Sequence, residues 1–222
     1  MRVLGIETSA AHRGSVALVE AGKLVCEASH TKPNTHAEKT LSLVEQVLAE
    51  AGWTRSSLDR VAVGIGPGSF TGLRVGMALA QGIALGLGIP VVGVGSLRAM
   101  AAAVPSDRHG LRVPLLDARR SELFATVYDV TGQELVAPLV LPRDTALAVL
   151  QQRAPGARVL IGEVTAALGI ADALHSAQTD LPHAASTARV GAGLDPALAP
   201  AEPLYVREAD AIKPDLPPSP FG

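Results

Sequence analysis

The stretch Gly64-Ile65-Gly66-Pro67-Gly68-Ser69-Phe70-Thr71-Gly72-Leu73-Arg74 decides how the first half of this chain folds. It continues a short β-branched run that begins at Val61, and it leads into an apolar segment of helical character, residues 69–87. The pattern predicts a strand, a sharp turn built from glycines, and a helix. The first turn of such a helix offers free backbone N–H groups to an anion, but the glycine spacing differs from the dinucleotide-binding pattern and there is no P-loop lysine. A turn that permits close backbone packing is therefore the favoured interpretation, with phosphate binding as the alternative.

The elements around this passage are arranged in two lobes of similar order. Three strands and a helix that begins at the capping box of Thr35 and Glu38 precede it, and a further strand follows it. The predicted strands of the first lobe are 2–8, 15–20, 23–29, 61–65 and 91–94, with helices at 35–51 and 69–87. The second lobe repeats this order more loosely, with strands at 111–116, 123–128, 135–140 and 158–161 and helices near 145–152 and after Glu163. We expect an α/β chain with an N-terminal lobe at 1–104, a hinge within 99–110, a C-terminal lobe at 111–213 and a flexible tail at 214–222.

Composition and charge narrow the class of protein. The single cysteine, Cys26, excludes an internal disulfide and a cysteine-based zinc site, which fits a cytoplasmic protein. A net charge of -2 and 3% aromatic residues are unfavourable for direct, tight RNA binding and for a base-stacking platform. The first residues lack the pattern of a secretory signal, so we expect a protein that is not exported. The uncharged run 75–97 is long enough to cross a bilayer, but Gln81, Pro90 and its glycines favour a helix followed by a strand, and we expect no membrane span.

Small side chains recur every four residues along the second predicted helix. They are Gly72, Gly76, Ala80, Ala84 and Gly88. This spacing places them on one helix face, where a neighbouring element can approach closely. Interior glycines each cost up to about 1 kcal/mol of helix stability relative to alanine, so packing has to compensate for them. The neighbour is either another subunit or the chain's own sheet. On the first interpretation, a bulky residue at Gly76 or Ala80 would abolish association and leave the monomer folded.

A search for catalytic residues finds only weak candidates. The histidines are scattered without metal-ligand spacing, no nucleophile elbow is present, and Cys26 lies in a predicted strand. We therefore expect no bound metal and no cofactor. Glu7, Thr8 and Ser9 after the first strand, together with Asp117 in the second lobe, stand where a two-lobed phosphotransferase keeps its acidic and hydroxyl groups. Backbone capping of turns is the simpler explanation for the same residues.

Five short motifs resemble the TsaB family in this order, at similar spacing and over essentially the whole chain. They are Gly5-Ile6-Glu7-Thr8-Ser9, His36-Ala37-Glu38, the glycine-rich stretch 66–74, Asp117-Ala118-Arg119 and Tyr205-Val206-Arg207. The glycine-rich motif is highly specific, whereas the others are weak on their own. The resemblance implies an actin-like ATPase fold with two ribonuclease H-like lobes, a mixed β-β-β-α-β-α sheet in each and a degenerate second lobe.

The resemblance also implies a task. TsaB proteins are the non-catalytic partner of TsaD, a homologous transferase that makes N6-threonylcarbamoyladenosine beside the anticodon in certain tRNAs, and the ATPase TsaE joins them. It implies that the helices at 35–51 and 69–87 bind a TsaD-type subunit or, without it, a second copy in a homodimer, and that tRNA is reached only through the complex. The interface residues expected on this basis are His36, Leu41, Val44, Leu48, Gly72, Gly76, Leu79, Ala80 and Ile83.

Some residues depart from the family patterns. TsaD-like proteins carry a His-x-x-x-His metal pair on the first helix, and this chain has His36 and Thr40 there. The difference favours a TsaB-like binding subunit over a transferase or a peptidase. Ala37 and Glu7 stand where Ser and Asp are usual, which argues against an intact nucleotide site. A small-molecule kinase or ATPase of the same superfamily is the alternative function, and it requires the weak candidates around Glu7 and Asp117 to surround a phosphate.

Overall fold

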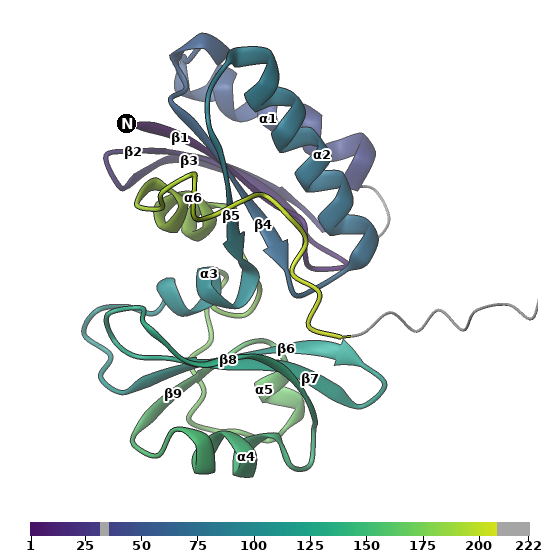
Figure 1. The fold of residues 1–222 in the computed structure, drawn as a ribbon, viewed down its shortest axis with the longest axis vertical. Coiled ribbons are helices and arrows are strands. Elements are labelled where there is room, and N and C mark those ends of the chain that lie inside the picture. The colour runs from purple at the N-terminus through teal and green to yellow at the C-terminus, as the bar shows by residue number, and fades with distance from the viewer. Residues whose placement is uncertain (32–35, 208–222) are drawn as a thin grey trace, which may run out of the picture.

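Two β-sheets form the frame of the computed structural model, which describes residues 1–31 and 36–207, with the backbone alone for 36–38 (Figure 1). The first sheet has the strand order β3-β2-β1-β4-β5. β1, β2 and β3 are antiparallel, whereas β4 runs parallel to β1, and β5 runs parallel to β4. Their bounds are Arg2–Glu7, Gly14–Glu20, Lys23–His30, Arg60–Gly66 and Val91–Gly95. The parallel register, which pairs Ile6 with Val63, brings the carboxyl ends of β1 and β4 to the same edge of the sheet.

Helices cover both faces of the first sheet. α1 (His36–Ala51) and α2 (Phe70–Leu87) lie side by side on one face, and α6 (Ala184–Ala192) covers the other (Figure 1). Alternate residues of β1 supply the two cores, because Leu4 and Ile6 pack on the α1 and α2 side and Val3 packs on the α6 side. Small side chains dominate the α6 side, so the helix lies close to the sheet.

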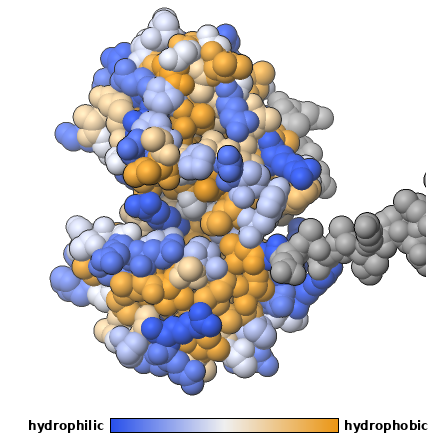
Figure 2. All heavy atoms as spheres, in the orientation of Figure 1, coloured by the Kyte–Doolittle hydropathy of each residue, from blue (hydrophilic) through white to orange (hydrophobic). Residues whose placement is uncertain are grey.

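The second sheet has the order β8-β7-β6-β9 and a smaller core of its own. Its strands are Leu111–Arg119 (β6), Glu122–Tyr128 (β7), Glu134–Pro142 (β8) and Arg158–Ile161 (β9). α4 (Ala146–Arg153) and α5 (Val164–Ala167) cover one face, and α3 (Ser96–Ala102) lies between the other face and the first lobe (Figure 1). A short 3-10 helix, Arg55–Ser57, precedes β4. Figure 2 shows apolar side chains gathered over this sheet around its edge strand β8, where Leu135 is 45% exposed.

The predicted strands and helices occur in the predicted order from β1 to α5, whereas two α-helices of the described residues, α3 and α6, and the short 3-10 helix were not predicted. The first residues of the expected hinge at 99–110 belong to helix α3. Leu97 and Met100 of this helix pack between the lobes. α6 lies within the range expected for the C-terminal lobe, 111–213, but it packs on the first sheet and not on the second. Without α6 the apolar face of the first sheet would stay uncovered, so a segment from the far end of the chain completes the first lobe. The expected cap residue Thr35 and the expected tail at 214–222 lie outside the described residues.

The small-residue face of α2 lies against its own sheet. Its buried small residues are Gly72, Gly76, Ala80 and Ala84. Thr8 Oγ1 donates a 2.8 Å hydrogen bond to the Gly72 carbonyl oxygen. A Cβ at Gly72 would overlap the Thr8 carbonyl oxygen, and a Cβ at Gly76 would overlap the Thr8 hydroxyl. The interpretation of this face as a surface for another subunit is therefore wrong, and the neighbour that the glycines admit is the end of β1.

α2 is also the one described helix that is long and apolar enough to cross a membrane, with 18 residues and a mean hydropathy of 1.3. In this structure it packs on β1, β4 and α1, with Leu73 and Met77 buried beneath it. The Ser69 side chain caps its N-terminus by accepting a hydrogen bond from Gly72 N, and Gly88 ends it in the left-handed conformation. The run 75–97 is thus a helix followed by strand β5, as the sequence predicts.

Substitution of Gly76 tests the close packing of α2 on β1. In Gly76→Ala the new methyl group meets the Thr8 hydroxyl, so we expect the free energy of unfolding to fall by about 1–3 kcal/mol. Gly82 provides the matched control in the same helix, because a Cβ there has no heavy atom within 4 Å. Gly82→Ala should stabilise the chain by up to about 1 kcal/mol through helix propensity alone. Urea denaturation of both variants measures the difference, and equal stabilities would contradict this packing.

Candidate functional site

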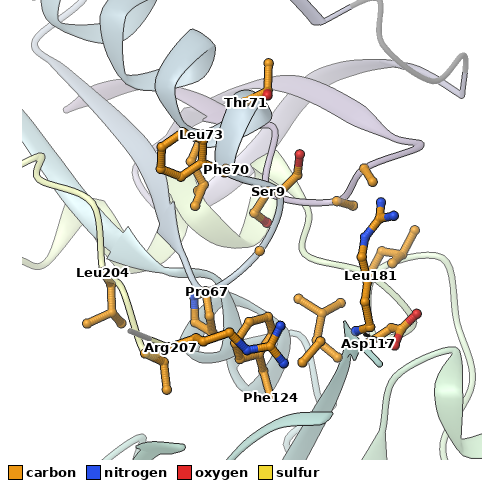
Figure 3. A pocket seen from close by; sticks show the side chains of 18 of the residues that line it. Ser9, Pro67, Phe70, Thr71, Leu73, Asp117, Phe124, Leu181, Leu204 and Arg207 are labelled. Atoms are coloured by element: carbon orange, nitrogen blue, oxygen red, sulfur yellow. Dashed lines mark hydrogen bonds between the residues drawn. The ribbon is translucent and has the colours of Figure 1, made fainter. Parts of the chain in front are cut away.

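A cleft of ≈ 1040 Å³ lies between the two lobes. The first lobe contributes Ser9 after β1 and the turn before α2, from Pro67 to Phe70. The second lobe contributes Asp117 near the end of β6 and Phe124 of β7 (Figure 3). A segment without regular structure, residues 204–207, forms a third wall. The cleft therefore collects residues from opposite ends of the chain, including two of the four weak candidates.

Glu7 lies behind the cleft wall and serves the fold. Its side chain is 1% exposed, and its carboxylate accepts hydrogen bonds from Ser9 N at 2.9 Å and from Thr187 Oγ1 of α6 at 3.0 Å. Burial raises the pKa of Glu7, and the hydrogen bonds from Ser9 and Thr187 offset that rise only in part. On the far side the carboxylate packs against the Cα of Gly64, where a Cβ would overlap it. Glu7 is therefore a structural residue that joins β1, β4 and α6.

Thr8 is also a structural residue, because it is fully buried and its hydroxyl donates a hydrogen bond to the Gly72 carbonyl oxygen of α2. Neither Glu7 nor Thr8 lines the cleft. The sequence correctly placed both residues at the carboxyl end of a strand. Their burial follows from α2 and α6 closing over that end, which no local pattern shows.

Ser9 and Asp117 do line the cleft. Ser9 is 1% exposed, its carbonyl oxygen accepts a 2.6 Å hydrogen bond from Ser69 N, and its Oγ has no hydrogen-bond partner among the described residues. Asp117 Oδ1 accepts bonds from Arg119 N at 2.9 Å and from Arg143 Nη2 at 2.8 Å. Asp117 thus caps the β6–β7 turn and forms an ion pair, as expected of a polar residue in a turn.

Polar side-chain contacts lie around the cleft. His12 Nε2 lies 3.5 Å from Glu163 Oε2, and Arg207 pairs with Glu122. Within residues 1–31 and 36–207, no group of three or more His, Cys, Asp or Glu side chains is placed to hold a metal ion. Thr40, which stands where the second histidine of a helical metal pair would fall, is 1% exposed.

The outer face of α1 and α2 is a second candidate site. The residues exposed on it include Leu41 of α1, at 50%, and Phe70 and Leu85 of α2, at 54% and 86%. α2 also exposes the small residues Ala78, Gly82 and Gly86, again four apart. We call this set, Leu41, Phe70, Ala78, Gly82, Leu85 and Gly86, the outer helix face.

The residues predicted for the partner interface divide between core and surface. Val44, Leu48, Gly72, Gly76 and Ala80 are buried in their own lobe, Leu79 and Ile83 are half-buried, and Leu41 is exposed. The side chain of His36 lies outside the described residues. These five residues pack inside their own lobe, so a partner contact of these helices would lie on their other sides. The exposed side of α2 carries Arg74, the one charged residue of this helix, and Gln81, its one side-chain amide, together with Gly82. Polar residues at helical spacing are the sequence signal that indicates the exposed side.

Comparisons with known proteins agree with this architecture. The family model described as "TsaD: tRNA N6-adenosine threonylcarbamoyltransferase" matches residues 29–175. The Escherichia coli "tRNA threonylcarbamoyladenosine biosynthesis protein TsaB" is 36% identical over 129 residues, 58% of this chain and 55% of that protein. The match thus spans about half the length of this curated relative.

Solved structures extend the similarity to both lobes. YeaZ from Pseudomonas aeruginosa has a TM-score of 0.71 and 26% identity, and the alignment covers 92% of this chain and 99% of that chain. The activator of 2-hydroxyisocaproyl-CoA dehydratase from Clostridium difficile shares the fold at a TM-score of 0.53 and 10% identity, covering 86% of this chain and 94% of that chain. The expected actin-like, ribonuclease H-like fold is confirmed.

The buried carboxyl group generates a pH prediction. Since its pKa is raised, the folded chain binds a proton at Glu7 more tightly than the unfolded chain does. This proton binding stabilises the folded chain fully at pH values below the pKa that Glu7 has in the unfolded chain. The stabilisation is lost as the pH rises through the pKa that Glu7 has in the folded chain. Glu7→Gln keeps an oxygen for the Ser9 N–H and carries no charge at any pH. In urea denaturation, we expect the free energy of unfolding of the variant, relative to the unaltered chain, to increase from about pH 4 to about pH 8. A difference that stays constant over this range would contradict the burial of an ionisable Glu7.

Proposed function

Because the chain belongs to the TsaD-type family, as a TsaB-like member, we propose that it is a non-catalytic subunit of tRNA threonylcarbamoyladenosine biosynthesis that binds and activates a TsaD-type transferase. In this proposal it acts in the cytoplasm, forms a homodimer when alone, joins a larger complex with a TsaE-type ATPase, and reaches tRNA only through that complex. The observation that carries the proposal is the combination of an exposed helix pair with catalytic candidates that are already used by the fold.

The state of the candidates supports a non-catalytic role. A phosphotransferase needs free acidic and hydroxyl groups at its phosphate site. In this chain the Glu7 carboxylate is bonded to Ser9 N and Thr187, and the Thr8 hydroxyl is bonded to the backbone of α2. Asp117 is paired with Arg143 at the cleft wall. The alternative of a small-molecule kinase or ATPase therefore requires groups that these contacts occupy. Calorimetric titration with Mg-ATP tests it, and micromolar binding with turnover would overturn the non-catalytic proposal.

The outer helix face supports subunit binding. Leu85 is 86% exposed in a helix whose other apolar side chains, apart from Phe70 and Ala78, are buried or half-buried, and it lies one residue before Gly86. Gly82 and Gly86 have open space where a Cβ would stand, so a helix of another subunit can come close to this part of α2. Apolar side chains next to small ones give a partner both contact area and close approach.

The family match indicates which partner this face suits. The TsaD family model matches residues 29–175 and thus includes α1 and α2, so a TsaD-type subunit carries an equivalent helix pair. Two equivalent helix pairs can pack around a two-fold axis or a pseudo-two-fold axis, with the same patch used on both sides. The same geometry accounts for a homodimer of this chain and for its replacement by a heterodimer.

Leu85→Glu tests the contact. A charge buried at the centre of an interface without a partner should weaken association with a TsaD-type subunit by about 2 kcal/mol or more, which is about 30-fold in Kd. Leu198 is the matched control, because it is 83% exposed and belongs to the C-terminal segment that packs beside β5. Leu198→Glu should bind like the unaltered chain. Co-elution on size exclusion followed by calorimetry measures both, and unchanged affinity of Leu85→Glu would overturn the assignment of the face.

Gly82→Leu tests the close approach separately from charge. The side chain enters open space in the monomer and improves helix propensity, so the free energy of unfolding should not fall. The same side chain fills the space that a partner helix would use, so we expect loss of co-elution with the TsaD-type subunit. Gln152→Leu on the exposed side of α4 serves as the control for added apolar surface. Retained binding by Gly82→Leu would exclude a helix contact at this position.

A further inference from the structure

We propose that His183 is a pH-dependent latch for the turn between β1 and β2, residues 10–13. While His183 is neutral it holds Arg13 of this turn, and when His183 is protonated Arg13 is released. Residues 10–12 line the cleft, so the charge of His183 determines how firmly this wall of the cleft is held. The inference does not rest on the proposed function, because none of these residues lies on the outer helix face.

The turn has weak backbone bonding of its own. The hydrogen bond from Arg13 N to the Ala10 carbonyl oxygen is 3.4 Å long, beyond the usual range of about 2.7–3.2 Å for such bonds. The position of the turn therefore depends on what the side chains of His12 and Arg13 contact.

The Arg13 side chain reaches from the turn to the segment that leads into α6. Its Nη1 donates a 3.1 Å hydrogen bond to the Ala177 carbonyl oxygen, and its Nη2 lies 2.6 Å from His183 Nε2. Arg13 Nε is buried and has no hydrogen-bond partner among the residues that the structure describes. The two Nη contacts thus fasten the turn to the residues at the start of α6.

The contact with Arg13 fixes where the proton of His183 lies. An arginine side chain has donors only, so His183 Nε2 accepts the hydrogen bond and carries no proton. On the other side of the ring, which is 3% exposed as part of His183, Nδ1 contacts the Glu27 carboxylate of β3. A neutral ring with its proton on Nδ1 suits both neighbours. A second proton can bind only at Nε2, where it removes the acceptor that Arg13 uses.

Glu27 decides which contact of His183 is lost on protonation. Its carboxylate also accepts a 3.2 Å hydrogen bond from Ala185 N in the first turn of α6. A positive charge on His183 strengthens its attraction to Glu27, whereas it places two cations side by side at Arg13. Arg13 is therefore the group that leaves, and α6 stays on the first sheet.

The other titratable side chains around the latch are engaged elsewhere. They are Glu7 of β1 with Thr187, Arg189 of α6 with the Gly22 carbonyl oxygen, His175 with Asp180 before α6, and His30 at the end of β3. His12, in the turn itself, lies 3.5 Å from Glu163 Oε2. These two side chains are 50% and 41% exposed, so protonation of His12 strengthens their contact only slightly. The strong anchor of the turn is thus the one between Arg13 and His183.

Long-range proton–nitrogen NMR of the full chain, labelled with 15N-histidine, tests the position of the proton. At about pH 8, where an ordinary histidine is neutral, we expect the assigned ring of His183 to show a protonated Nδ1 and a bare Nε2. A ring protonated at Nε2 under these conditions would overturn the proposal, because it could not accept a bond from Arg13.

Hydrogen exchange of the backbone amides of residues 10–14 tests the release. Histidine ordinarily gains its second proton between about pH 8 and about pH 5. After correction for the intrinsic pH dependence of exchange, we expect these amides to exchange about tenfold faster at the lower pH, because a hydrogen bond of a charged group is lost. The amides of residues 188–192 in α6 should show no such acceleration. Equal corrected rates for the turn at both pH values contradict the latch.

Two variants assign the effect to His183. His183→Gln keeps an oxygen that can accept from Arg13 and cannot be protonated, so the turn should exchange at the same corrected rate at both pH values. His175→Gln is the matched control, because it removes a neighbouring histidine that pairs with Asp180, and it should keep the acceleration in acid. Acceleration that persists in His183→Gln, or that disappears in His175→Gln, excludes His183 as the latch. The proton position and the pH dependence are measured on the unaltered chain, so the proposal can fail without either variant.

Discussion

The close approach of backbones at the carboxyl end of β1 is the constraint on which the first lobe depends. Four elements meet there around two buried polar side chains. Gly64 of β4 lies against the Glu7 carboxylate, and Gly72 and Gly76 of α2 lie against Thr8. A Cβ at any of these three positions would overlap its neighbour. From the other face, Thr187 of α6 bonds Glu7. The glycine-rich stretch that opens α2 is thus explained by packing, because only glycine allows a helix to start so close to the strand beside it.

This constraint also limits the chemistry of the chain. The acidic and hydroxyl groups that a phosphotransferase would present are, at Glu7 and Thr8, the groups that hold β1, α2 and α6 together. Buried polar groups stabilise a fold only when they are hydrogen-bonded, and releasing either one would cost the fold its partner. The lobe has an ATPase-like fold, but the polar side chains at this edge of its sheet hold the fold together. The surface that we propose for subunit binding, the outer helix face, lies away from this edge.

The candidate interface shows where a pattern stops being informative. α2 has small residues four apart on two sides, with Gly76 and Ala80 on one and Ala78 and Gly82 on the other. Periodicity identifies such a face without saying what lies against it, since a core and an interface have the same composition. Thr8 decides the question, because its side chain takes up the space beside Gly76. The contact joins residues far apart in the chain, and the same is true of Phe70 and Tyr205.

The sequence alone determined the order of the nine strands and of α1, α2, α4 and α5, the strand-turn-helix passage at 60–87 and the resemblance to the TsaB family, because periodicity, capping and turn residues act over a few neighbours. The tertiary structure alone decided which side of α2 is outside, that Glu7 is buried, and that α6 completes the first lobe. These features arise where segments distant in sequence compete for the same space. Such competition is settled by packing of the whole chain, and no local pattern carries it.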